Sequence, residues 1–170
     1  MPSTDDDEWK ATTVTQLTTF LWYDTEAEEA ATFYASVFPD ASVGEIVRYV
    51  DAGPGKPGSA MTVSFEIGGQ PFVGLNGGPD HHFTEAISFQ VPCETQDDVD
   101  RYWSVLSEGG EEGPCGWLKD RFGLSWQIVP NALPELLGDP DPARANRAMQ
   151  AMLGMKKIEI EGLRAAADAG

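Results

Sequence analysis

The fold is decided by residues 19–39, which read TFLWYDTEAEEAATFYASVFP. The apolar and hydroxyl residues from Gln16 to Tyr23 are typical of a strand, and Asp24-Thr25 then offers capping oxygens to a helix. Apolar residues recur at helical spacing from Glu26 to Val37, and Pro39 ends that segment. Three further strands are expected over residues 42–50, 59–67 and 70–76. The unit is therefore strand, helix and three strands.

A second unit of the same kind begins near Glu85. Its strand is predicted over residues 86–91 and its helix over residues 95–106. A shift of 69 positions aligns chemically matched residues, namely Thr19 with Ser88, Phe20 with Phe89, Glu28-Glu29 with Asp97-Asp98, Phe33-Tyr34 with Tyr102-Trp103, and Val37 with Leu106. The period is too long for a solenoid, so we predict an α+β fold of two βαβββ-type modules related by a pseudo-twofold axis.

Four regions follow from this pattern. Residues 1–14 form an acidic tail that we expect to be disordered, and residues 15–80 form the first module. Residues 81–131 form a shortened second module, because only residues 117–120 and 124–129 read as later strands. Residues 132–170 form a helical extension whose apolar face includes Met149 and Met152. That face predicts a homodimer.

Composition restricts the partners and the compartment. The chain has 11 basic and 28 acidic residues, a net charge of −17, which repels nucleic-acid phosphates and anionic lipid. We therefore expect neither a nucleic-acid partner nor a membrane partner. Two cysteines and an N-terminus without a signal segment predict reduced thiols and a cytoplasmic protein. The acidity fits adaptation to salt as well as it fits an ordinary acidic protein.

Several motifs in fixed order resemble the PhnB-like branch of the vicinal oxygen chelate superfamily, also called the glyoxalase/bleomycin-resistance/dioxygenase superfamily. They are Leu21-Trp22-Tyr23-Asp24, Val37-Phe38-Pro39, Leu75-Asn76-Gly77-Gly78-Pro79, the segments 115–120 and 122–130, and Met152-Leu153-Gly154-Met155-Lys156-Lys157. The resemblance implies paired βαβββ modules whose curved mixed sheets form a cup, commonly in a dimer. Some members carry a demethylubiquinone methyltransferase name, which this sequence does not support. Its residues 53–58 form a proline-broken connection and not a loop that seats an adenosyl cofactor, so we expect no cofactor.

The resemblance also implies where a metal would bind. Superfamily enzymes hold a divalent ion in the cup with His, Glu or Gln side chains, and the matching positions here are Leu17 or its neighbour on the first strand, Asn76, Ala86 and Gln127. Leucine and alanine cannot ligate an ion, and two carboxamides are weak ligands, so we predict no metal. His81 and His82, with Glu85 nearby, remain open as a local metal site or an acid/base pair.

Strand alternation suggests which side chains line the cup. We assign to the helix side Phe20, Trp22, Ile87, Phe89, Val91, Trp126 and Ile128, and to the opposite side Thr19, Leu21, Ser88, Gln90, Ser125 and Gln127. The predicted substrate-binding residues are Thr19, Asn76, Ser88, Gln90, Trp117 and Gln127. Their hydroxyls and carboxamides suit a small polar organic molecule.

Three functions are compatible with this pattern. The first is a small-molecule-binding protein with a metal-free polar cup. The second is a lyase, isomerase or dioxygenase of the glyoxalase type that uses a metal or an acid/base such as Glu85. The third is a resistance protein that sequesters an antibiotic in a groove between two chains. The residues do not identify the ligand.

Overall fold

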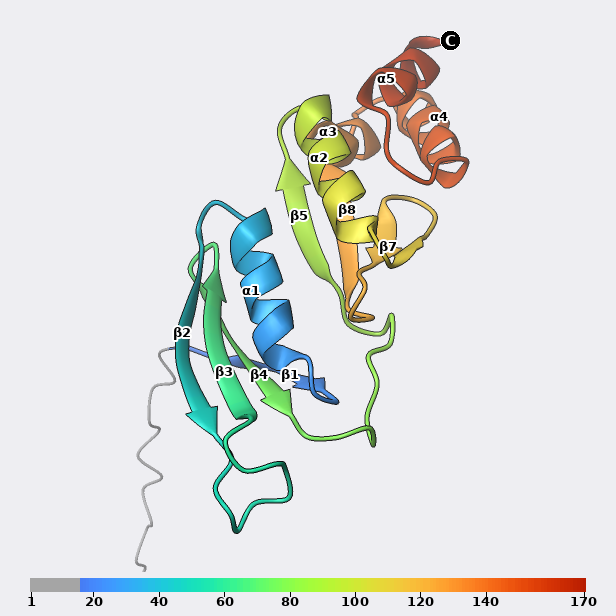
Figure 1. The fold of residues 1–170 in the computed structure, drawn as a ribbon. Coiled ribbons are helices and arrows are strands. Elements are labelled where there is room, and N and C mark those ends of the chain that lie inside the picture. The colour runs from blue at the N-terminus through green and yellow to red at the C-terminus, as the bar shows by residue number, and fades with distance from the viewer. Residues whose placement is uncertain (1–15) are drawn as a thin grey trace, which may run out of the picture.

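The computed structural model describes residues 16–170 and forms two βαβββ modules in series (Figure 1). The first contains β1 (Thr19–Tyr23), α1 (Ala27–Val37), β2 (Ala41–Arg48), β3 (Ala60–Ile67) and β4 (Gln70–Asn76). The second contains β5 (Phe89–Cys93), α2 (Gln96–Ser107), β6 (Glu111–Glu112), β7 (Trp117–Lys119) and β8 (Ser125–Pro130). The predicted α+β class and the duplication are confirmed. The predicted acidic tail lies outside the described residues.

Each module folds into its own four-stranded mixed sheet. The strand orders are β1-β4-β3-β2 and β5-β8-β7-β6, so the two sheets have the same topology. In each sheet the first strand runs parallel to the last, and the remaining pairs are antiparallel. No strand of one sheet pairs with a strand of the other among the described residues. The sheets of one chain are therefore not closed into a complete cup.

A buried carboxylate joins the two modules on their helix side. Asp120 is 2% exposed, and its Oδ2 accepts hydrogen bonds from the Tyr34 hydroxyl at 2.7 Å and the Trp126 indole at 2.8 Å. Its Oδ1 accepts from the backbone N–H groups of Phe122 and Leu124 at 2.9 and 3.0 Å. Tyr34 lies on α1 and Trp126 on β8, so one side chain connects both modules and shapes the turn before β8.

In the first module, the side chains of β1 lie on the opposite faces of the sheet from those predicted. Leu21 and Tyr23 are buried in the core, at 5% and 3% exposure, whereas Phe20 is 63% exposed. Phe20 and Trp22 therefore lie on the sheet face turned away from α1. In the second module the prediction is confirmed for Val91, Trp126 and Ile128, which are buried, but Ile87 precedes β5 and is 70% exposed.

A one-residue difference between the modules explains this error. The 69-residue shift aligns the helices correctly, because Tyr34 and Trp103 are both buried, as are Val37 and Leu106. The strands, however, share their burial pattern at a shift of 70, with Thr19 matching Phe89. Three residues connect β1 to α1, but only two connect β5 to α2. A slip of one residue moves every side chain of a strand to the other face.

The C-terminal extension contains three helices, α3 (Ala132–Leu137), α4 (Pro142–Leu153) and α5 (Ile160–Asp168), of which α3 was not predicted. Figure 1 shows α4 and α5 beyond the second module, away from the first. They have a small core of their own, made of Leu133, Leu136, Ala148, Ile158, Leu163 and Ala167. None of the described helices is long and apolar enough to cross a bilayer.

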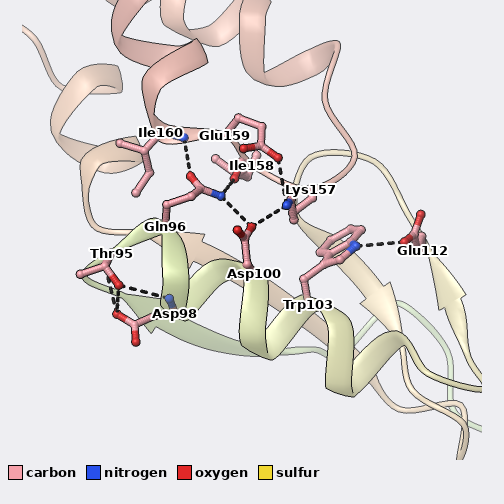
Figure 2. A network of polar contacts seen from close by, with 10 residues as sticks. All are labelled: Thr95, Gln96, Asp98, Asp100, Trp103, Glu112, Lys157, Ile158, Glu159 and Ile160. Atoms are coloured by element: carbon pink, nitrogen blue, oxygen red, sulfur yellow. Dashed lines mark hydrogen bonds and ion pairs between the residues drawn. The ribbon is translucent and has the colours of Figure 1, made fainter.

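Side chains of α2 attach this extension to the second module, as Figure 2 shows. The Gln96 Nε2 donates to the Ile158 carbonyl at 3.1 Å, and its Oε1 accepts from the Ile160 N–H at 2.8 Å. The Lys157 ammonium donates to the Asp100 carboxylate one turn along α2. The extension therefore has a fixed place on the module that carries the candidate site.

Candidate functional site

The face of the second sheet opposite α2 carries four neutral side chains that lie together. We call them the glutamine patch: Ser88, Gln90, Trp117 and Gln127. The Gln127 Nε2 donates to the Ser88 Oγ at 2.8 Å. Gln90 on β5 and Trp117 on β7 are the cross-strand neighbours of Gln127 on β8. Gln127 takes this face because Trp126 and Ile128 on either side of it are buried in the core.

Asn76, another predicted site residue, does not join the patch. Its side chain is buried on the helix side of the first sheet, where Oδ1 accepts from the Ala27 N–H at 2.8 Å and Nδ2 donates to the Ala60 carbonyl at 3.0 Å. The N-cap residue of α1, Glu26, makes no capping hydrogen bond of its own. Asn76 thus satisfies the first turn of α1 from a distant strand.

Thr19 also lies away from the patch. It occupies the first position of β1, on the same face as Leu21, and its hydroxyl accepts from the Gln70 side chain at 3.3 Å. This placement follows from the one-residue difference between the modules. The structure therefore brings together four of the six predicted residues and separates Thr19 and Asn76 from them.

The part of the corresponding face of the first sheet formed by β1 and β4 is apolar, whereas β3 contributes Ser64 beside it. The positions that match Gln90 and Gln127 hold Phe20 and Val73, which are cross-strand neighbours. Trp22 lies beside them, and its indole N–H donates to the Gly78 carbonyl at 2.8 Å. His81 contacts Trp22 edge to face, with ring centroids 4.7 Å apart. This histidine therefore packs on an aromatic ring of the first module.

A pocket of about 380 Å³ adjoins the patch at Trp117. Its polar lining comes from Glu85, Glu111, Glu112, Lys119 and Ser125. The Lys119 Nζ lies 2.5 Å from Glu85 Oε1 and 4.0 Å from Glu111 Oε2. The hydrogen bond from Lys119 lowers the pKa of Glu85, and the same bond raises the pKa of Lys119. Glu85 is thus an ion-paired carboxylate and a poor proton acceptor near neutral pH.

Sequence reasoning missed Lys119 and Glu111 as components of this pocket. A usable signal was present, because Trp117 and Lys119 are two residues apart on a predicted strand and so share one face. Glu111 gave no such signal, since β6 contains only two residues and was not expected to be a strand.

A second cavity borders the patch on its other side. It measures about 490 Å³ and lies between the modules, with Ser88 and Gln90 in its wall beside Phe72 and Tyr102. The glutamine patch therefore lies between two hollows, and a bound molecule could extend from it in either direction.

The side chains at the positions implied for a metal do not fit a divalent ion. Leu17 is 80% exposed and Ala86 has no ligand atom. Both polar groups of the Asn76 side chain are used in hydrogen bonds to backbone, and Gln127 bonds to Ser88. Within residues 16–170, no three or more His, Cys, Asp and Glu side chains form a group that could hold a metal ion. A neutral carboxamide alone compensates poorly for dehydration of an ion.

Comparison with known proteins identifies the family. The sequence model of a family described as 3-demethylubiquinone-9 3-methyltransferase matches residues 15–129. A PhnB protein from Bacillus cereus is 35% identical with a TM-score of 0.60, and the match covers 67% of this chain and 98% of that protein. The Pseudomonas aeruginosa protein PA1353 shares the fold at 16% identity, with a TM-score of 0.57 and coverage of 69% and 98%. A glyoxalase/bleomycin resistance protein from Albidiferax ferrireducens is 13% identical, with a TM-score of 0.44 and coverage of 67% and 96%. No curated protein matches the chain.

The methyltransferase description has no counterpart in the glycine-rich segment of this chain. Residues 53–58 connect β2 to β3, two antiparallel neighbours, whereas a loop that binds a nucleotide-type cofactor joins a strand to the N-terminus of a helix. The family match nevertheless extends over both modules and ends before α3. The chain therefore belongs to this family, which we call PhnB-like after the Bacillus cereus protein.

Proposed function

We propose that the protein binds a small polar organic molecule at the glutamine patch, without a metal. The observation that carries this proposal is the hydrogen bond from Gln127 to Ser88 at 2.8 Å on a partly open sheet face. That bond uses one donor of the Gln127 carboxamide and leaves its Oε1 without a donor among the described residues. The Gln90 side chain likewise has no described partner. Neutral carboxamides of this kind pair well with the carbonyl or hydroxyl groups of a neutral ligand.

The patch is proposed to be enclosed by a second copy of the chain. In one chain the face of the first sheet opposite α1 carries the exposed apolar residue Phe20, at 63%, beside Val73, and Ile87 in the segment before β5 is 70% exposed. Large apolar side chains clustered on a sheet face indicate a surface that is covered in the working protein. A homodimer in which one sheet face covers another would bury Phe20 and complete the cup. The two cysteines, Cys93 and Cys115, are free thiols, which suits the cytoplasmic location that we propose.

An enzyme of the glyoxalase type receives less support from the site. Its metal would need charged or imidazole ligands at positions that hold leucine, alanine and two carboxamides. Its metal-free version would need a proton acceptor, but the ion pair with Lys119 lowers the pKa of Glu85 and so makes its carboxylate a weaker base. Antibiotic sequestration uses the same face and differs only in the identity of the ligand.

Native mass spectrometry tests this proposal. The wild-type protein, purified without a tag and incubated with a bacterial metabolite extract, is expected to retain a non-covalent organic molecule. Gln127→Ala should lower its occupancy, because removal of one buried hydrogen-bonding partner typically costs about 1–3 kcal/mol. Gln150→Ala is the matched control, since Gln150 is an exposed glutamine on α4, away from the patch and both cavities. Equal occupancy in wild type and Gln127→Ala, or an equal loss in Gln150→Ala, would contradict the proposal.

A further inference from the structure

We propose that the pocket beside the glutamine patch binds the cationic group of an organic amine. This inference rests on the proposed function, because it assigns a ligand class to the same sheet face. Three features of the pocket support it, namely its charge, its aromatic wall and a buried hydroxyl group. Each is a separate observation.

The charge of the pocket favours a cation. Three carboxylates, Glu85, Glu111 and Glu112, line it together with one ammonium group, Lys119. Lys119 pairs with Glu85 at 2.5 Å. Glu112 accepts a hydrogen bond from the Trp103 indole at 3.0 Å and pairs with the Lys156 ammonium, outside the pocket lining, at 3.6 Å. Glu111 lies 4.0 Å from Lys119 with its side chain 79% exposed, so its charge is the least neutralised of the three. The net charge of the whole chain, −17, adds to the attraction of a cation and the repulsion of an anion.

The wall of the pocket suits an amine with an apolar body. Trp117 is half-buried and lines both the pocket and the glutamine patch. The face of an indole ring attracts an ammonium group, and its area also covers an apolar carbon skeleton. A ligand that contacts Trp117 could therefore place its cation near Glu111 and its polar groups near Gln127.

A buried hydroxyl at the floor of the pocket has no protein partner. Ser125 is 1% exposed and lines the pocket, and it is the cross-strand neighbour of Lys119. Its Oγ makes no hydrogen bond to any residue of the described part of the chain. Buried polar groups are almost always hydrogen-bonded, so an unpaired hydroxyl beside a cavity indicates that a ligand group supplies the bond. This observation is independent of the charges at the rim.

The test compares three probes of one shape. They are 2-phenylethylammonium, neutral 2-phenylethanol and anionic 3-phenylpropionate, titrated into the wild-type protein by calorimetry at pH 7 and low salt. The ammonium is expected to bind several-fold more tightly than the alcohol, and the carboxylate most weakly. Added salt should reduce the difference between the ammonium and the alcohol, since exposed charges are screened.

Variants that change the charge of the pocket test whether its carboxylates attract the ammonium probe. Glu111→Gln should weaken binding of the ammonium about two- to fivefold, which is typical of an exposed ion pair. Lys119→Gln should strengthen binding, because it frees Glu85 from its pair, and Ser125→Ala should weaken it about two- to tenfold. Glu135→Gln, at an exposed carboxylate on α3 outside the pocket, should leave it unchanged.

Two results would overturn the inference. One is equal affinity for the alcohol and the ammonium, or no detectable binding of the ammonium. The other is weaker ammonium binding in Lys119→Gln. If these occur while Gln127→Ala still loses the molecule taken from the extract, the ligand class is wrong and the proposed function stands. If the charge order holds but Gln127→Ala has no effect, the assignment of the patch fails instead.

Discussion

Replacement of Asn76 by alanine separates a structural role of this residue from a binding role. The substitution removes two buried hydrogen bonds, to the Ala27 N–H at 2.8 Å and to the Ala60 carbonyl at 3.0 Å. Ala27 is fully buried and Ala60 is 6% exposed, so water cannot easily replace the lost partner. Each unpaired buried group costs about 1–3 kcal/mol, which gives a loss of about 2–6 kcal/mol in the free energy of unfolding.

Thermal unfolding followed by circular dichroism measures this loss. A destabilisation of about 3 kcal/mol lowers the Tm of a domain of this size by roughly 6–12 °C. Asn131→Ala is the matched control, because Asn131 is an exposed N-cap residue of α3 that makes no capping hydrogen bond. It should change the free energy of unfolding by less than about 0.5 kcal/mol. An Asn76→Ala protein with the Tm of the wild type and with lost ligand binding would refute the reasoning and return Asn76 to the site.

Three further predictions concern assembly and the C-terminal extension. Phe20→Asp should shift the protein from dimer to monomer in sedimentation velocity, whereas Leu153→Asp, at an exposed position on α4, should not; the reverse outcome would assign the interface to the helices. Gln96→Ala should raise hydrogen exchange in α5 selectively, because it removes the bonds to the backbone at residues 158 and 160. The hydrogen bond from Lys157 lowers the pKa of Asp100, so this ion pair contributes fully above about pH 4 and is lost as the pH falls through the lower folded pKa. The protection factors of the α5 amides, which are corrected for the intrinsic pH dependence of exchange, should accordingly fall as the wild type is acidified through the pKa of Asp100. Protection factors that stay constant until the whole protein unfolds would count against this attachment.

The sequence predicted the duplication because the helix pattern survives in both halves. The buried positions of α1 and α2 match at a shift of 69, including the aromatic pair Tyr34 and Trp103. The same shift misplaced β1, since the connection before α1 is one residue longer than the connection before α2. The match of Phe20 to Phe89 looked chemically sound, yet the two side chains lie on opposite faces of their sheets. The residue types in the two strands could not reveal that these two connections differ in length. The burial patterns of β1 and β5 in the structure do reveal it.

The candidate site was predicted where strand alternation alone decides the placement. Gln90 and Gln127 each stand between two apolar residues that face the core, and their strands, β5 and β8, are paired although they are far apart in the sequence. Period-two alternation therefore placed both side chains on the same face correctly. Asn76 was misplaced because its role depends on a hydrogen bond to Ala27, a contact across 49 positions that no local pattern shows. The pocket at Lys119 depends in the same way on the two-residue strand β6 and on the segment that carries Glu85.

The central claim is that the site binds an organic molecule through neutral side chains and needs no metal. Elemental analysis of untagged protein from cells grown with added Zn, Mn, Fe and Ni tests it most directly, with Gln127→Ala measured beside the wild type. The account predicts far less than one metal ion per chain in both proteins. A stoichiometric metal in the wild type that is lost in Gln127→Ala would contradict it.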